Sequence, residues 1–314
     1  MADGRKLRSW YTREQVSSPT ISNDSLFALL TVSAAERRKI ISWDVEGAYL
    51  LADQDDFVLV KFTGESVDVL CQVDVGYQEF VTYGNGKKIL YLELLKALYG
   101  CVRSALLWYE LYSTKLQGMG IILNPYDTCV ANKDIEGKQC TIGYYVDDNL
   151  ATHDSDTVLK EVADLVEKEV GKITITTGNK HNFLGMDLTF HENGTVTIDM
   201  SDYVVDALKE FPDKLRSDAA SPTHPDLFYI DHFSPSMSKE NSDLSHSLVM
   251  KLMWVSQRCR LDVATTIANT PVEPLPLDVV CLCHCQRSSI LIQGVQLKVK
   301  LLAYLTMPRT QFGC

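Results

Sequence analysis

Three aspartates are the residues of this chain whose types and spacing best suit chemistry. Asp147 and Asp148 follow the apolar, strand-like run 140–146 and precede a second apolar run. Because side chains alternate along a strand, such a pair at a hairpin tip offers one carboxylate to a metal ion while the other flanks it. Asp44 also ends an apolar run, 40–43. Carboxylates from two strands are the oxygen ligands that Mg²⁺ takes in two-metal nucleotidyl transfer.

The composition predicts a soluble globular protein. The 314 residues are 46% hydrophobic and 23% charged, with length enough for one large domain or two ordinary ones. No apolar window is long enough for a membrane span, the N-terminus lacks a secretory signal, and nine scattered cysteines suit a reducing compartment. We therefore expect a cytoplasmic location, with access to the nucleus left open. The net charge of −11 argues against nucleic-acid binding, which usually requires a basic surface.

Hydrophobic periodicity predicts an α+β protein in which an antiparallel sheet packs on helices. The expected helices are 22–38, 102–117, 155–170, 202–211 and 245–259. Hairpin turns are expected at residues 84–86, 136–137 and 193–194. Residues 213–243 are interpreted as a polar connection, and residues 269–296 show no sustained helical or strand period.

Four motifs, in order, resemble those of the reverse transcriptase of copia-type LTR retrotransposons. The first catalytic motif is residues 44–50, the second is 96–100 with Ser104 and 107–109, the third is 145–148, and the segment near the primer grip is 183–186. A later stretch, 247–262, is similar to the downstream connection segment. The resemblance covers about residues 20–268.

The resemblance implies a polymerase palm, with its antiparallel sheet packed on helices, partial fingers, and the start of a thumb or connection region. We therefore expect four parts. They are partial fingers and the first helix in 1–40, the palm in 41–200 with an interleaved fingers segment at about 60–110, a thumb- or connection-like segment in 201–268, and an atypical, disrupted tail in 269–314.

The activity implied by the resemblance is RNA-directed DNA polymerisation, a nucleotidyl transfer. Asp44, Asp147 and Asp148 would be catalytic and would hold two Mg²⁺ ions, with Mn²⁺ as a substitute. Tyr49 would be the steric gate against ribonucleotides. The implied nucleotide-binding residues are Val45, Gly47, Ala48, Tyr49, Tyr99 and Gly100, and the implied primer-grip residues are Phe183, Leu184, Gly185 and Met186.

The implied partners are an RNA template, a DNA primer and dNTPs, with no membrane. RNase H and integrase regions would lie elsewhere in a parent polyprotein. The chain also departs from the family pattern: the usual Lys-Gln-Ser-Pro-Arg is 102–106, Val-Arg-Ser-Ala-Leu, and the usual Arg-Pro-Asp is 260–262, Arg-Leu-Asp.

Two other hypotheses stay open. One is a degenerate, catalytically inactive retrotransposon remnant that keeps the palm fold, with a local frame disruption across 269–296. The other is an unrelated α+β binding protein whose Asp-Asp hairpin has no chemical role.

Other conspicuous residues have simpler interpretations. A solvated acidic turn explains Asp53, Asp55 and Asp56, and core packing explains Trp108 and Tyr109. A zinc site is a weak spacing match for the cluster in 281–285, because four ligands within five residues do not easily surround one tetrahedral ion. Its residues are Cys281, Cys283, His284 and Cys285.

Overall fold

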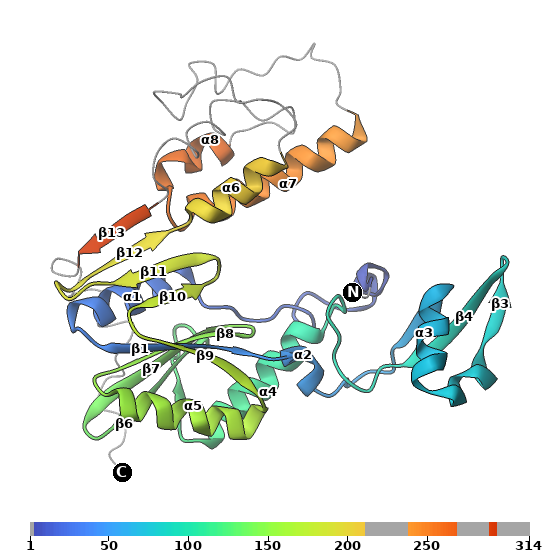
Figure 1. Cartoon of the computed structure of the whole chain (residues 1–314), viewed down its shortest axis with the longest axis horizontal. Helices are drawn as coiled ribbons and strands as arrows, with labels where there is room; N and C mark the ends of the chain where they lie inside the picture. The colour runs from blue at the N-terminus through green and yellow to red at the C-terminus, as the bar shows by residue number, and fades with distance from the viewer. Residues whose placement is uncertain (1–2, 211–237, 269–288, 294–314) are drawn as a thin grey trace.

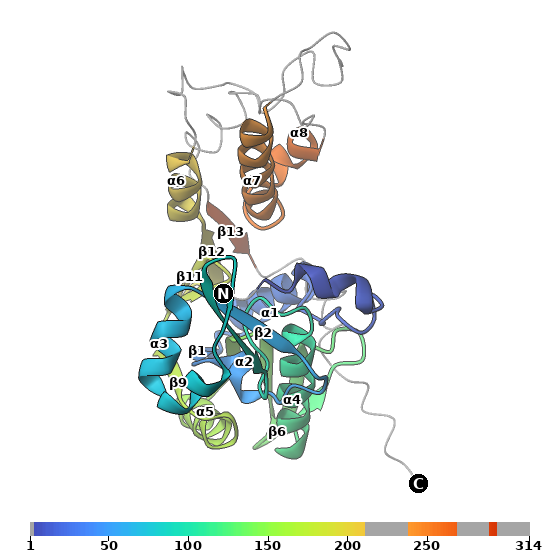
Figure 2. The ribbon, with the colours of Figure 1, turned by 90° about the vertical axis from the view of Figure 1, so that its right-hand side faces the viewer.

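The computed structural model describes residues 3–210, 238–268 and 289–293. In this part of the chain, two antiparallel sheets and their helices share one hydrophobic core, and a third, smaller sheet projects from them (Figures 1 and 2). The predicted α+β class is therefore confirmed. None of the described helices is both long enough and apolar enough to cross a membrane.

The largest sheet has six antiparallel strands in the order β5-β6-β7-β8-β1-β9. They are β1 (Lys39–Val45), β5 (Ile122–Leu123), β6 (Val130–Ile135), β7 (Lys138–Tyr145), β8 (Asp148–His153) and β9 (Ile173–Thr177). Helices α4 (Ser104–Gly118) and α5 (Asp156–Val170) lie against one face, and α1 (Asn23–Ala35) lies against the other (Figure 1). Both sides of β1 are paired, with β8 on one side and the edge strand β9 on the other.

The long helices form where their caps and apolar stripes predict them. The Ser22 hydroxyl accepts the Ser25 N–H at 3.2 Å and so begins α1. In α5, the buried stripe repeats every four residues through Val158, Val162 and Val166, and Gly171 ends the helix with a φ of +86°, which glycine adopts without strain. Both helices confirm the periodicity of the sequence within a few residues of the expected bounds.

A second sheet, in the order β10-β11-β12-β13, packs above α1. Its strands are β10 (Lys180–Phe183), β11 (Met186–Phe190), β12 (Thr195–Asp199) and β13 (Ser289–Gln293). The strand β13 lies within 269–296, where no regular element was expected, so that prediction was wrong for residues 289–293. It forms by antiparallel pairing with β12, a long-range contact that local periodicity does not report.

The C-terminal helices lie beside this second sheet (Figure 2). They are α6 (Ser201–Lys209), α7 (Lys239–Ser256) and α8 (Ala264–Ala268), with the 3₁₀ turn η3 (Leu261–Val263). Helix α7 begins earlier than its apolar stripe predicted, because the Ser238 hydroxyl caps it by accepting the Asn241 N–H at 3.3 Å. Residues 213–237 of the expected 213–243 connection lie outside the described residues.

The third sheet, in the order β2-β4-β3, projects to one side of the molecule (Figure 1). It contains β2 (Leu59–Thr63), β3 (Thr82–Gly84), β4 (Lys87–Glu93), α3 (Glu65–Val73) and the 3₁₀ helix η2 (Val75–Phe80). The hairpin around 84–86 was predicted, whereas β2 and α3 were not. Two short elements, η1 (Arg5–Trp10) and α2 (Ala48–Leu51), lie between this unit and the main body.

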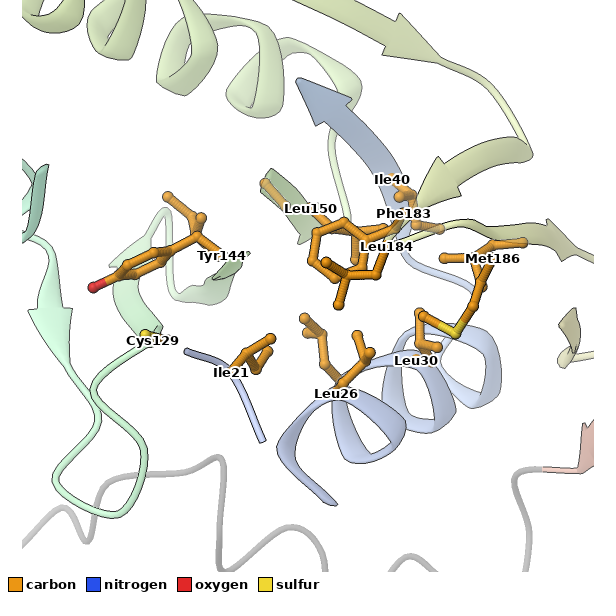
Figure 3. Packing of buried hydrophobic residues seen from close by; sticks show 14 of the residues in the cluster. Ile21, Leu26, Leu30, Ile40, Cys129, Tyr144, Leu150, Phe183, Leu184 and Met186 are labelled. Carbon is orange, nitrogen blue, oxygen red and sulfur yellow. The ribbon is translucent and has the colours of Figure 1, made fainter. Parts of the chain in front are cut away.

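Helix α1 joins the two larger sheets into one core. Its buried Leu26 and Leu30 lie beneath Leu184 and Met186 of the β10–β11 hairpin (Figure 3). These four side chains are each less than one-tenth exposed. The hairpin is therefore held against the large sheet by apolar packing.

Gly143 in β7 gives a test of this packing. A Cβ at Gly143 would lie 2.8 Å from Leu29 Cδ2 and 2.9 Å from Ile21 Cδ1, so Gly143→Ala is expected to lower the free energy of unfolding by about 1–3 kcal/mol through overpacking. Gly118→Ala, at the end of α4, meets open space and should leave stability unchanged or raise it by up to about 1 kcal/mol. Urea denaturation measures both, and equal midpoints would contradict the close approach.

Candidate active site

The pairing of β1 with β8 brings the predicted aspartates together. Asp44 and Asp148 are directly opposite in the antiparallel register, and the Val45 N–H donates to the Asp147 carbonyl at 3.2 Å. Side chains directly opposite on antiparallel strands project from the same face, with Cβ atoms about 5 Å apart. That face is the one turned away from α4 and α5, because the next residue, Asn149, bonds to Tyr112 of α4. Two of the three carboxylates therefore share the face of the sheet that carries α1 and the β10–β11 hairpin, at the end of β1.

The hairpin tip differs by one residue from the sequence-based expectation. Tyr145 and Asp148 pair across the hairpin, so the turn consists of Val146 and Asp147, and Asp148 is the first residue of β8. Val146 has φ +56°, the left-handed conformation that a two-residue hairpin turn requires at its first position. Asp147 therefore lies on the turn and Asp148 in the strand.

Burial and mutual repulsion both raise the pKa values of two of these carboxylates. Burial, followed by the negative charges of Asp147 and Asp44, raises the pKa of Asp148 to about 6. Burial and Asp147 likewise raise the pKa of Asp44. Aspartate oxygens are the ligands that Mg²⁺ prefers, and a divalent cation would relieve the repulsion. Among the described residues, no three potential ligands already converge on one point.

The raised pKa of Asp148 predicts how stability changes with pH in the absence of divalent ions. A carboxyl whose pKa rises on folding binds its proton more tightly in the folded state, so the free energy of unfolding falls as pH rises from about 4 to about 6. Asp148→Asn should remove this slope and raise the free energy of unfolding at pH 8 by about 1–2 kcal/mol. A shift of two pKa units corresponds to about 3 kcal/mol, and the partial exposure of Asp148 reduces that value. Thermal unfolding in EDTA across pH 4–8 measures the slope, and parallel curves for both proteins would contradict it.

Two tyrosines from separate motifs pack against each other beside Asp147, with their ring planes inclined at 37°. Tyr49, in α2, lies with its ring centroid 4.3 Å from that of Tyr99. The Tyr99 hydroxyl donates to Asp147 Oδ2 at 3.4 Å. Burial and the charge of Asp147 raise the pKa of Tyr99 to about 12, so the hydroxyl stays protonated. The structure thus gathers residues of three motifs around Asp147.

The other expected nucleotide-binding residues are close neighbours in sequence of these two tyrosines, and their main-chain atoms determine the local structure. Val45 and Ala48 are buried, and the Val45 N–H is engaged by Asp147. Gly47, with φ +68°, allows the chain to turn from β1 into α2. Gly100, with φ +98°, accepts the Gly4 N–H at 3.0 Å. Contacts from these residues to a ligand would therefore come largely from main-chain atoms.

The expected primer-grip residues form the turn between β10 and β11. Phe183, Leu184 and Met186 are buried in the core, and Leu184 and Gly185 have φ +54° and +73°. A backbone hydrogen bond from Leu184 to Asp148 favours the ionised carboxylate. The turn thus touches the aspartates by its main chain while its side chains hold it in place.

The acidic residues after the first motif are more structured than expected. Asp55 and Asp56 form ion pairs with Arg103 at 2.6 and 2.7 Å, and Asp53 forms one with Lys96 at 2.6 Å. All three carboxylates remain exposed, as predicted, but the turn is tied to the second motif. Sequence spacing gave no sign of pairs that span more than forty positions.

A buried hydrogen-bond network beneath the hairpin was also missed. The Trp108 indole donates to the Val146 carbonyl at 2.8 Å, the Tyr112 hydroxyl donates to Asn149 Oδ1 at 2.6 Å, and Asn149 Nδ2 donates to the Asp147 carbonyl at 2.7 Å. Trp108 packs in the core as predicted, with 1% of its surface exposed. Its spacing of four residues from Tyr112 signalled a shared helix face, but not what that face would bind.

The cysteine-rich cluster of 281–285 lies outside the described residues, as does the stretch 294–314. Of the two candidate metal sites, the structure therefore describes only the aspartate site.

Residues 3–224 match the family described as reverse transcriptase (RNA-dependent DNA polymerase). The chain belongs to this family. The match includes all four motifs and ends before helix α7. No curated protein matches the chain.

Two solved telomerase structures are similar to this reverse transcriptase family member. One is apo telomerase from Candida tropicalis, truncated from its C-terminal domain, with TM-score 0.33 and 13% identity over 59% of this chain and 41% of that one. The other is telomerase from Candida albicans in complex with a TWJ fragment of telomeric RNA, with TM-score 0.31 and 10% identity over 83% of this chain and 51% of that one. The chain thus spans about half the length of these proteins or less.

Proposed function

We propose that the chain is the polymerase domain of a copia-type retrotransposon reverse transcriptase, which extends a DNA primer on an RNA template. The observation that carries the proposal is the register of β1 and β8, which sets Asp44 opposite Asp148 with Asp147 on the adjoining turn. The copia assignment is supported by the resemblance of the four motifs, in order, to that group.

Asp44, Asp147 and Asp148 would hold two Mg²⁺ ions. Bound there, the ions would activate the primer 3′-hydroxyl and stabilise charge on the α-phosphate and the departing pyrophosphate. Burial and, after it, the negative charge of neighbouring carboxylates raise the pKa values of Asp44 and Asp148, and the repulsive part supports this role because a cation would relieve it. Mn²⁺, which also takes carboxylate ligands, would substitute.

The protein's own groups would orient the reactants. The Tyr99 hydroxyl holds one oxygen of Asp147, leaving the carboxylate restricted in rotation. The Tyr49 ring, packed against the Tyr99 ring, would lie beside the sugar of an incoming dNTP and exclude a ribose 2′-hydroxyl. The main chain around Gly47 would meet the triphosphate, since backbone N–H groups next to a left-handed glycine can form an anion-binding nest.

The proposed partners are an RNA template, a DNA primer and dNTPs. The primer terminus would lie at the ends of β1 and β8 that carry Asp44 and Asp148, next to the main-chain turn of Leu184 and Gly185. RNase H and integrase activities would come from other regions of a parent polyprotein.

One observation favours the alternative of an inactive remnant that keeps the palm fold. Arg103, which lies in the departing stretch 102–106 after the second motif's glycine, is held by Asp55 and Asp56 and so is less available to a triphosphate. The ion pairs leave the three aspartates unchanged but reduce the positive charge that this stretch offers to a ligand.

Primer extension distinguishes the two. The full chain is incubated with poly(rA)/oligo(dT), dTTP and Mg²⁺, and extension is followed on a gel. We expect extension that requires dTTP, stops with EDTA and recovers when excess Mg²⁺ or Mn²⁺ is restored. A cooperatively unfolding protein that extends no primer would support the remnant instead.

A further inference from the structure

Two tight turns beside the aspartates each contain an aliphatic residue in the left-handed region. Val146, in the β7–β8 turn, has φ +56°, and Leu184, in the β10–β11 turn, has φ +54°. Glycine, asparagine and aspartate usually occupy such positions, because a Cβ crowds the backbone there, most of all in a β-branched residue. Both turns are therefore strained, and something in the surrounding structure must hold them.

Each strained residue has its carbonyl bound by a tryptophan. Trp108 Nε1 donates to the Val146 carbonyl at 2.8 Å, and Trp254 Nε1 donates to the Leu184 carbonyl at 3.3 Å. The two tryptophans come from different helices, α4 and α7, that approach the turns separately. A carbonyl fixed in direction fixes the plane of the peptide that follows it. For Val146, the next residue is Asp147.

The surroundings of both indoles restrict them in turn. Trp108 stacks on Tyr112 with ring centroids 5.1 Å apart and is almost completely buried. Trp254 meets the ring of Tyr145 edge-on at 6.3 Å, and the Arg258 guanidinium lies 3.3 Å from the centre of its ring. Rings packed on several sides keep their N–H groups pointing in one direction.

The backbone of Asp147 and the carboxylate of Asp148 are linked to this arrangement. On one side, the second carbonyl of the β7–β8 turn, that of Asp147, accepts the Asn149 amide at 2.7 Å. On the other side, the Leu184 backbone bonds to the Asp148 carboxylate. Displacement of either turn would therefore move a carboxylate of the site.

We propose that Trp108 and Trp254 are positioning residues, whose indole N–H groups hold the two strained turns so that Asp147 and Asp148 keep one arrangement. The catalytic part of this proposal rests on the proposed polymerase function. Through Trp254, helix α7 also becomes part of the support of the site, although it lies beyond the four motifs. Simple core packing is the competing explanation for both tryptophans.

A double-mutant cycle separates positioning from packing. Trp108→Phe keeps an aromatic ring but removes the N–H, and we expect kcat for primer extension to fall about tenfold with KM within about twofold, since small misplacements of reacting groups cost one to two orders of magnitude. Val146→Gly relieves the strain, so in that background the same Trp108→Phe change should cost less than about threefold. Trp254→Phe and Leu184→Gly form the second cycle.

The control for packing is Leu116→Val, which loosens the buried face of α4 without removing a hydrogen bond. If it lowers kcat as much as Trp108→Phe at equal loss of stability, or if the glycine background leaves the cost unchanged, packing explains the tryptophans and the proposal is wrong.

A second measurement does not need catalysis. Hydrogen–deuterium exchange of peptides covering 144–149 should accelerate about tenfold in Trp108→Phe and return towards the wild-type rate in the double variant, because exchange reports local opening. Unchanged exchange would overturn the proposal. If the wild-type chain extends no primer, the proposed function fails, and the exchange cycle still decides whether the indoles hold the turns.

Discussion

Replacing Asp147 by asparagine is expected to reduce primer extension by about a thousandfold. The change removes one of the carboxylates proposed to hold the ions, and losing a stabilising charge of this kind costs about 4 kcal/mol in the transition state. The fold should remain intact, because the backbone groups of Asp147 make its contacts to Val45 and Asn149. The measurement is single-turnover extension in Mg²⁺, where kcat falls and primer binding changes little.

Asp134→Asn is the matched control. Asp134 is an exposed aspartate on β6 of the same sheet, near the turn that leads into β7 at the opposite end from Asp147. It changes the net charge by the same amount, so it tests whether activity follows the charge or the site. Equal extension by wild type and Asp147→Asn would remove the metal role assigned to Asp147. Equal losses in both variants would indicate an unspecific effect of charge.

Shortening Tyr49 is expected to weaken discrimination against ribonucleotides by about a hundredfold. A pocket that excludes a hydroxyl by shape loses its selectivity when the excluding ring is removed, and a single added group is worth up to about two orders of magnitude. The contact with the Tyr99 ring positions the Tyr49 ring. Tyr49→Ala also removes this contact from Tyr99 and should therefore lower kcat for dNTPs. Competition between rUTP and dTTP in primer extension measures the selectivity.

Tyr49→Phe is the control for the second prediction. It keeps the ring and its contact with Tyr99 but removes the hydroxyl, so the discrimination should stay within about threefold of wild type if bulk forms the gate. Loss of discrimination in both variants would assign the selectivity to the hydroxyl, and its retention in Tyr49→Ala would show that Tyr49 is not the gate.

The elements that local physics determines were predictable from the sequence. Capping and periodicity located α1 and α5, and glycine signals located the turns near Gly86 and Gly194. The strand β13 and the sheet strand β2 were not predictable, because the first depends on a partner far along the chain and the second has mixed exposure along its length. Helix α7 was found, but its start depended on a capping serine that lies before the apolar stripe.

The aspartates of the site were predictable from the sequence, but the residues that hold them in place were not. Asp44 and Asp147 stand at ends of apolar runs, and a strand-end carboxylate is visible in a sequence. The hydrogen bond from Trp108 to Val146 is not, because both residues also satisfy the simpler rules for a core aromatic and a strand valine. Nor does the sequence reveal the pairing of Arg103 with two acidic residues, which requires knowing that η1, α4 and the loop before β2 meet.

The position of β1 between β8 and β9 sets the order of events during synthesis. Both partners of β1 lie later in the chain, and Asp44 precedes its opposite residue Asp148 by about 100 residues. At usual translation rates, β1 therefore waits about 5 to 20 seconds for its first neighbour. During that interval β1 has no partner strand, so three of its apolar side chains that are buried in the folded protein stay unpacked. They are Ile40, Ile41 and Trp43. The strand that carries the first aspartate therefore leaves apolar side chains exposed on the nascent chain until β8 has been synthesised.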